Sequence, residues 1–122
     1  MPVGHARELL DATLAAEVVV LAAPVYWYSL PAPAKLYLDH WSHWMRVPDL
    51  AFRDRMRGKR LALTTAMAGA DPAEAAPLIE SLRLTAAYMG MAWGGHVLAH
   101  ANAAGDVLRD GATLAEARGL LV

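Results

Sequence analysis

The feature that most constrains the fold is a short apolar run from Val18 to Ala23, which follows Glu17 and is ended by Pro24. Three consecutive valines open the run, and no polar residue interrupts it. Such a run predicts a strand with both faces covered, as in the strands of parallel sheets. Parallel strands need crossover connections, so the rest of the chain is expected to alternate helices with strands.

The remaining sequence supplies that alternation. Two more strands are expected at residues 60–65 and 92–98, the second weakened by Gly94 and Gly95. Apolar periodicity and end signals predict helices at residues 5–16, 30–45, 77–89 and 112–121, with a loose turn at Asp71 and a charged loop at residues 53–59. The order predicts one doubly wound α/β domain over residues 1–122, with three strands and flanking helices.

Composition narrows the functional classes. The chain has 122 residues, enough for one domain, and 57% are hydrophobic, so a packed core is expected rather than disorder. A net charge of −1 gives no broad attraction for nucleic acid or an anionic membrane. The absence of cysteine excludes disulfides, thiolate metal sites and a cysteine nucleophile. Prolines interrupt the longest uncharged stretch, and the start lacks signal-peptide character, so we expect a cytoplasmic protein.

Two loops follow the carboxyl ends of the first two strands, where ligands of open α/β sheets bind. The first, residues 24–29, contains Tyr26, Trp27 and Tyr28 in succession, and the second, residues 65–69, ends in Gly69. Aromatic faces and free backbone N–H groups suit a flat heteroaromatic ring, and glycine lets the backbone approach it closely. The alternative, which the residues leave open, is that the aromatics form an apolar plug over the sheet edge.

The first loop resembles a known motif. The segments Pro24-Val25-Tyr26-Trp27 and Leu30-Pro31-Ala32, followed by Lys35 and Asp39, resemble the second flavin loop of the flavodoxin-like FMN-dependent NAD(P)H oxidoreductases. Ala34 departs from the leucine usual in that family. Weaker matches extend the resemblance over nearly the whole chain, at Gly58-Lys59, Met89-Gly90-Met91 and Gly105-Asp106.

The resemblance implies a flavodoxin-like fold, bound FMN, and hydride transfer from NAD(P)H through FMN to a quinone, azo or other small acceptor. It also implies that the two loops hold the isoalloxazine ring between them. The residues expected to contact the cofactor are Pro24, Val25, Tyr26, Trp27, Ser29, Thr65, Ala66, Met67 and Gly69. No side chain is expected to act as an acid or base, because the cofactor carries the chemistry of the flavin half-reaction.

The sequence departs from the family at its start. The family begins with a strand, a phosphate-binding loop, a helix and a second strand, whereas this sequence starts near the helix before the third strand. Pro31 and Pro33 remove N–H groups from one candidate phosphate-binding helix start, and Asp71 and Pro72 make another a poor anion site. No phosphate-binding glycine motif stands elsewhere, so the FMN phosphate is expected to lack a cradle in this chain.

The same departure bears on assembly. In the family sheet, the strand at residues 18–23 lies beside the first strand, so here it is expected to present a bare apolar edge. We expect that edge to pair with a second copy, giving a homo-oligomer, or with a separate N-terminal chain. Three functions therefore stay open: an oxidoreductase or a fragment of one with a misassigned start, a non-catalytic assembly module, and a subunit completed by another chain.

Other candidates carry less. Arg53, Arg55, Arg57, Lys59 and Arg60 suggest recognition of the NADPH 2′-phosphate, but the cluster precedes its strand and is expected at the opposite end of the sheet. His40 and His43 share a helical spacing with no third ligand except Asp39, so no metal site is predicted. Trp41 and Trp44 suit a subunit interface, and for Trp41 packing in the core is an equal alternative. Ser29 has no partnered base, which leaves a hydrolase triad without support.

Overall fold

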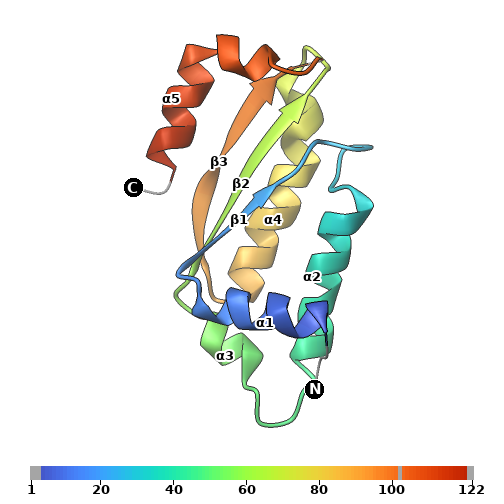
Figure 1. Cartoon of the computed structure of the whole chain (residues 1–122), viewed down its shortest axis with the longest axis vertical. Helices are drawn as coiled ribbons and strands as arrows, with labels where there is room; N and C mark the ends of the chain where they lie inside the picture. The colour runs from blue at the N-terminus through green and yellow to red at the C-terminus, as the bar shows by residue number, and fades with distance from the viewer. Residues whose placement is uncertain (1–3, 102, 121–122) are drawn as a thin grey trace.

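The computed structural model describes residues 4–101 and 103–120. Within them, three parallel strands form one sheet in the order β1-β2-β3 (Figure 1). The strands are β1 (Val18–Ala22), β2 (Arg60–Met67) and β3 (Ala92–His100). The predicted sheet and its three strands are confirmed. Both β2 and β3 run further than expected, so the second candidate loop begins inside β2.

Four helices match the prediction: α1 (His5–Ala15), α2 (Ala32–Trp44), α4 (Ala76–Tyr88) and α5 (Gly111–Gly119). The predicted end of the last helix, Leu121, lies outside the described residues. Gly90 ends α4 in the left-handed region at φ 69°, and the N–H of Met91 bonds the carbonyl of Ala86 at 2.9 Å. This is the helix-end motif that favours glycine. No helix in the described ranges is long and apolar enough to cross a membrane.

The predicted charged loop at residues 53–59 is wrong in its first part, because a short helix, α3 (Phe52–Met56), forms there. Phe52 and Met56 stand one helical turn apart and are both buried, so they anchor the turn in the core while charged residues between them face outward. Two 3₁₀ turns complete the chain, η1 (Pro72–Ala75) and η2 (Asp106–Arg109). The first of them is the predicted loose turn at Asp71.

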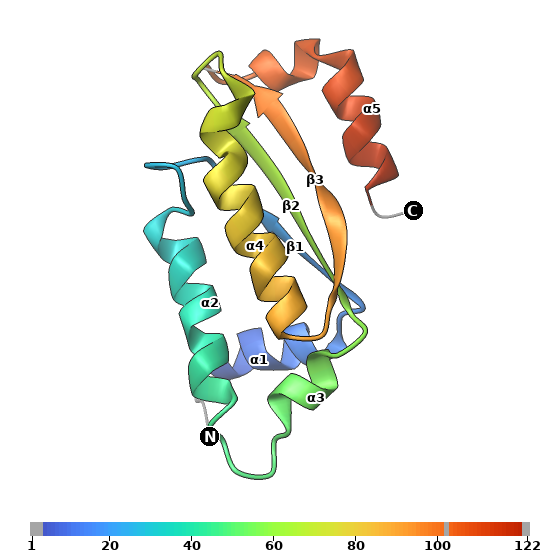
Figure 2. The ribbon, with the colours of Figure 1, turned by 180° about the vertical axis from the view of Figure 1, so that it is seen from behind.

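The main core lies on one face of the sheet. Figure 2 shows α4 lying across that face with α2 beside it. Alternate strand residues point into this layer, as period-2 burial requires, among them Val19, Leu21, Leu61 and Leu63. They cluster with Leu78 and Leu82 of α4. Trp41 and Trp44 are both buried in the same cluster, so the hypothesis that they mark a subunit interface is wrong.

The outer edge of β1 is unpaired in the described part of the chain, where β1 pairs with β2 alone. Ala23 donates its N–H to Thr64 at 3.1 Å, and the carbonyl of Glu17 accepts from Arg60 at 3.0 Å. Residues at alternate positions of a parallel strand direct both backbone groups to the same neighbour. Residues 18, 20 and 22 therefore direct theirs away from β2. Pairing of this edge with another chain stays a prediction.

The strand β3 carries one extra residue opposite β2. Leu61 lies opposite Trp93, but Leu63 lies opposite His96, which marks a β-bulge at the two glycines. A Cβ on Gly94 would lie 3.3 Å from the carbonyl oxygen of Leu61, and Gly95 has φ 92°. The expected weakening by these glycines takes the form of a bulge, in which close backbone approach is combined with a left-handed residue, and the strand continues past it.

Candidate functional site

The two predicted loops meet at the carboxyl end of the sheet. The N–H of Val25 bonds the carbonyl of Ala66 at 3.4 Å, which joins the segment after β1 to the end of β2. A cavity of about 270 Å³ lies between the loops. We call it the ring cleft, and its lining residues are Val25, Trp27, Tyr28, Met67, Ala68, Gly69 and Glu74.

The aromatic loop is a tight two-residue hairpin. The N–H of Tyr26 bonds the carbonyl of Ser29 at 2.9 Å, and the N–H of Ser29 bonds the carbonyl of Tyr26 at 3.0 Å. The two central residues, Trp27 and Tyr28, lie at φ 50° and 66°. This region favours glycine and costs a residue with a Cβ about 1–2 kcal/mol. Strained backbone of this kind is concentrated at functional sites, where the surrounding structure maintains it.

The strained hairpin holds its aromatic rings out of the core. Tyr26, Trp27 and Tyr28 are 58%, 93% and 56% exposed. The alternative that they plug the edge of the sheet is therefore wrong, because a plug would bury them. Three exposed aromatic side chains on one rigid turn instead provide a surface on which a flat ligand can stack.

The opposite wall of the ring cleft is mostly backbone. A Cβ on Gly69 would collide with Oε2 of Glu74, so glycine at residue 69 is what lets that carboxylate lie against the main chain. The carbonyl of Gly69 lies 3.1 Å from Nδ1 of His100, a contact that ties the loop to the end of β3. Met67 is buried beneath this wall and supplies an apolar floor.

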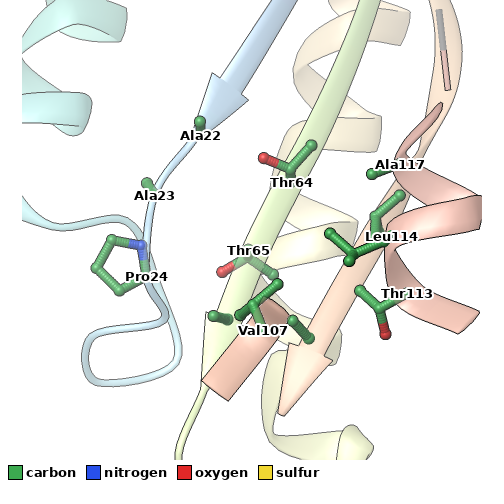
Figure 3. Close-up of a pocket in the computed structure, with 12 residues that line it drawn as sticks. Ala22, Ala23, Pro24, Thr64, Thr65, Val107, Thr113, Leu114 and Ala117 are labelled. Carbon is green, nitrogen blue, oxygen red and sulfur yellow. The ribbon is translucent and has the colours of Figure 1, made fainter. Parts of the chain in front are cut away.

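A second cavity of about 440 Å³ lies on the other face of the same strand ends, between the sheet and α5 (Figure 3). It is largely apolar and includes Val97 and Leu114 in its wall. The hydroxyl oxygen of Thr65 is buried and has no hydrogen-bond partner. An orphaned buried hydroxyl of this kind is one that a ligand or water can satisfy.

The structure thus distributes the nine predicted cofactor residues over several places. Val25, Trp27, Met67 and Gly69 line the ring cleft. The cavity under α5 takes Pro24, Thr65 and Ala66. Ser29 lines a third cavity of about 360 Å³ between α2 and α4, and Tyr26 lies at the base of the hairpin.

Sequence reasoning left three lining residues out of the predicted set. Tyr28 and Ala68 lie within the two predicted loops, so the sequence could have indicated them. Glu74 belongs to the loose turn predicted at Asp71 and was not among the expected cofactor residues. It lies five residues beyond Gly69, and no sequence signal shows that η1 folds its carboxylate back over that glycine.

The basic cluster lies away from this site, as expected from its position before β2. A cavity at the amino end of the sheet includes Arg55, Arg57 and Arg60 in its wall. Lys59 donates to the last carbonyls of α1, those of Leu14 and Ala16. In the part of the chain that the structure describes, no group of three or more metal-ligating side chains comes together.

The residues present fit a flavin ring better than its phosphate. The helices α2, α4 and α5 begin at the carboxyl end of the sheet (Figure 1). Pro31 and Pro33 stand at the start of α2, and Asp71 caps the turn before α4. At α5 the hydroxyl and the backbone N–H of Thr113 bond Asp110 and hold its pKa below the usual range. A carboxylate or a proline thus stands at each helix start where a phosphate would bind.

Comparison with known proteins decides the family. A family model described as a flavodoxin-like fold matches residues 3–119. The chain belongs to the flavodoxin-like fold family. The family expected from the hairpin motif and the fold expected from the strand pattern are thereby both confirmed.

This flavodoxin-like chain is 33% identical over 115 residues to YwqN of Bacillus subtilis, provisionally named an NAD(P)H-dependent FMN-containing oxidoreductase. The match covers 93% of this chain and 63% of YwqN, so the chain spans less than two thirds of that relative. A solved Trp repressor binding protein from Bacillus subtilis superposes with a TM-score of 0.89 at 29% identity. That superposition covers 96% of this chain and 76% of the other.

A further solved structure has the same fold at lower sequence identity. General stress protein 14 from Treponema denticola, solved in complex with FMN, superposes with a TM-score of 0.61 at 20% identity. The superposition covers 98% of this flavodoxin-like chain and 70% of the other. At this identity the likeness concerns the fold alone.

Proposed function

We propose that this chain serves an FMN-dependent NAD(P)H oxidoreductase that passes hydride from NAD(P)H through the flavin to a quinone, azo or other small acceptor. The observation that carries the proposal is the ring cleft, with aromatic side chains on one wall and the small residues Ala68 and Gly69 on the other. The relatives support the same activity, since YwqN is named for FMN and NAD(P)H. Bound FMN would supply the hydride chemistry.

The chain's own residues would bind and orient the ring. Trp27 and Tyr28 would stack on it, and Val25 and Met67 would exclude water from its apolar edge. The backbone at Ala68 and Gly69 would bond its polar edge, with the carboxylate of Glu74 beside it. These roles need no proton transfer by a side chain, in line with the absence of a catalytic acid or base from the predicted site.

The first test compares FMN with riboflavin, which has the ring and lacks the phosphate. We expect saturable binding of both, with dissociation constants within about three-fold, because the described helix starts offer the phosphate little. A cradled phosphate would gain charge-assisted bonds of about 1.5–3 kcal/mol, hence a ten-fold or larger preference for FMN. Quenching of flavin fluorescence measures both constants.

Each outcome of this titration has a distinct meaning. Riboflavin binding followed by NAD(P)H-dependent reduction of a quinone supports the proposed activity. A strong preference for FMN would contradict the expected lack of a phosphate site while leaving the activity intact. Failure of a folded sample to bind either flavin would overturn the proposed function.

A second candidate function, a non-catalytic assembly module, is favoured by the unpaired edge of β1. The backbone groups of Val18, Val20 and Ala22 point outward, and neither a proline nor a lysine protects this edge. Antiparallel pairing with a second copy, centred on Val20, would join two sheets across a two-fold axis.

We expect Val20→Pro to abolish this pairing, because it removes an outward N–H and leaves the bonds to β2 in place. Sedimentation equilibrium should show a concentration-dependent dimer for the original chain and a monomer for the variant. Leu36→Ala, an exposed change on α2, is the matched control and should keep the dimer. A monomer at all concentrations of the unaltered chain would contradict edge pairing.

A further inference from the structure

The carboxylate of Glu74 lies in the ring cleft because of the turn that carries it. Asp71 caps η1 by accepting the N–H of Ala73 at 2.9 Å, and its carbonyl accepts the N–H of Glu74 at 3.1 Å. The turn directs Oε2 of Glu74 back against Gly69, where it fills the space that a Cβ would occupy. Glu74 thus closes the end of a cleft whose other side chains are uncharged at neutral pH.

In the part of the chain that the structure describes, no side-chain cation pairs with this carboxylate. None of the ion pairs in the described ranges includes Glu74, and no basic residue lines the ring cleft. Asp71 at the start of the same turn adds negative charge, and Nδ1 of His100 contacts the carbonyl of Gly69. The ring cleft therefore combines aromatic walls with an uncompensated negative charge.

We propose that Glu74 determines the charge of the aromatic ligands that this cleft accepts, favouring flat cationic or neutral molecules over anionic ones. The proposal rests on the proposed function in one respect, the use of the ring cleft as the binding site. A carboxylate within a few ångströms of a ligand attracts a cation and repels an anion, more strongly beside apolar walls than in bulk water. Trp27 and Tyr28 add attraction for a cation over their faces.

The fold around Glu74 does not depend on the charge of its side chain. Among residues 4–101 and 103–120 its carboxylate makes no hydrogen bond, and the cap of η1 comes from Asp71. The side chain is exposed, so replacement by glutamine keeps its size and leaves the packing of Ala75 and Leu78 unchanged. Charge can thus be removed here without disturbing the fold.

The test uses two tricyclic dyes of nearly the same shape and opposite charge, thionine as the cation and resorufin as the anion. Their dissociation constants are measured by fluorescence at low ionic strength. We expect the unaltered chain to bind thionine more tightly. In Glu74→Gln, the affinity for thionine should fall and the affinity for resorufin should rise. Each change should be about two- to five-fold, the range for charge interactions at exposed sites. Glu74→Lys should reverse the preference.

Controls separate charge from shape. Glu116→Gln removes a carboxylate from the exposed surface of α5 and should leave both constants unchanged. Salt at 0.5 M should reduce the difference between the dissociation constants of the two dyes in the unaltered chain, because it screens exposed charges. Circular dichroism checks that each variant folds.

The outcomes distinguish the two proposals. If riboflavin binds and Glu74→Gln leaves both dyes unchanged, or shifts both in the same direction, charge selection by Glu74 is wrong and the proposed function stands. If neither riboflavin nor either dye binds the folded, unaltered chain, the ring cleft is not a ligand site and both proposals fail.

Discussion

Replacement of Trp44 by alanine is expected to lower the free energy of unfolding by about 3–5 kcal/mol, the usual range for removing a buried large aromatic side chain. Trp44 is 0% exposed, and its ring centroid lies 5.4 Å from that of Phe52 and 6.2 Å from that of Tyr37. A loss of this size is a large part of the stability of an ordinary domain. Urea unfolding followed by circular dichroism measures it.

Trp44→Phe is the matched control. The indole Nε1 of Trp44 has no hydrogen-bond partner in the structure, so phenylalanine forfeits volume but no hydrogen bond. Less than half of the loss caused by alanine is therefore expected. If alanine at residue 44 cost no more than alanine at an exposed position, the central place of α2 in the core would be contradicted.

Replacement of Trp27 by alanine should have the opposite profile. This side chain is 93% exposed, so the unfolding midpoint should hardly change. Riboflavin binding should weaken by about 5- to 150-fold, because stacking of a planar ring on an aromatic side chain is worth about 1–3 kcal/mol. Fluorescence titration of the same protein samples gives the two results side by side.

An exposed aromatic side chain outside the ring cleft serves as the control for non-specific binding of riboflavin to apolar surface. Tyr88 is 59% exposed on α4, beneath the guanidinium of Arg53 at 4.3 Å, and lies outside the ring cleft. Tyr88→Ala should leave riboflavin affinity unchanged. Equal losses in the two variants would show that the dye-like ring binds apolar surface at large, which would remove the reason for assigning the hairpin a site.

The fold was predictable from the sequence because its elements are long and their signals agree. The apolar run of β1 indicated a buried strand without an alternative. Gly90 indicated the end of α4, because the left-handed conformation at that position favours glycine. The helix α3 was missed because it is only one turn long. Only Phe52 and Met56 in it are apolar and buried, whereas its three charged residues are typical of a loop. Tertiary burial decided that segment.

The candidate site was predictable in its location but only partly in its geometry. Position at the carboxyl ends of strands follows from topology, so the two loops could be named. The left-handed turn could not, because tryptophan and tyrosine are poor signals for positive φ. Glu74 was missed because its approach to Gly69 depends on the path of η1, which no local pattern encodes.

The extra residue in β3 has a consequence for the far end of that strand. Past the bulge, Val97 and Ala99 lie opposite Thr64 and Ala66 and line the cavity under α5, while His100 lies opposite Met67. Because strand side chains alternate with a period of two, one residue fewer at the glycines would invert every later position. The two glycines thus determine which face of the sheet each later side chain of β3 occupies. They thereby place the imidazole of His100 where it contacts the loop of the ring cleft.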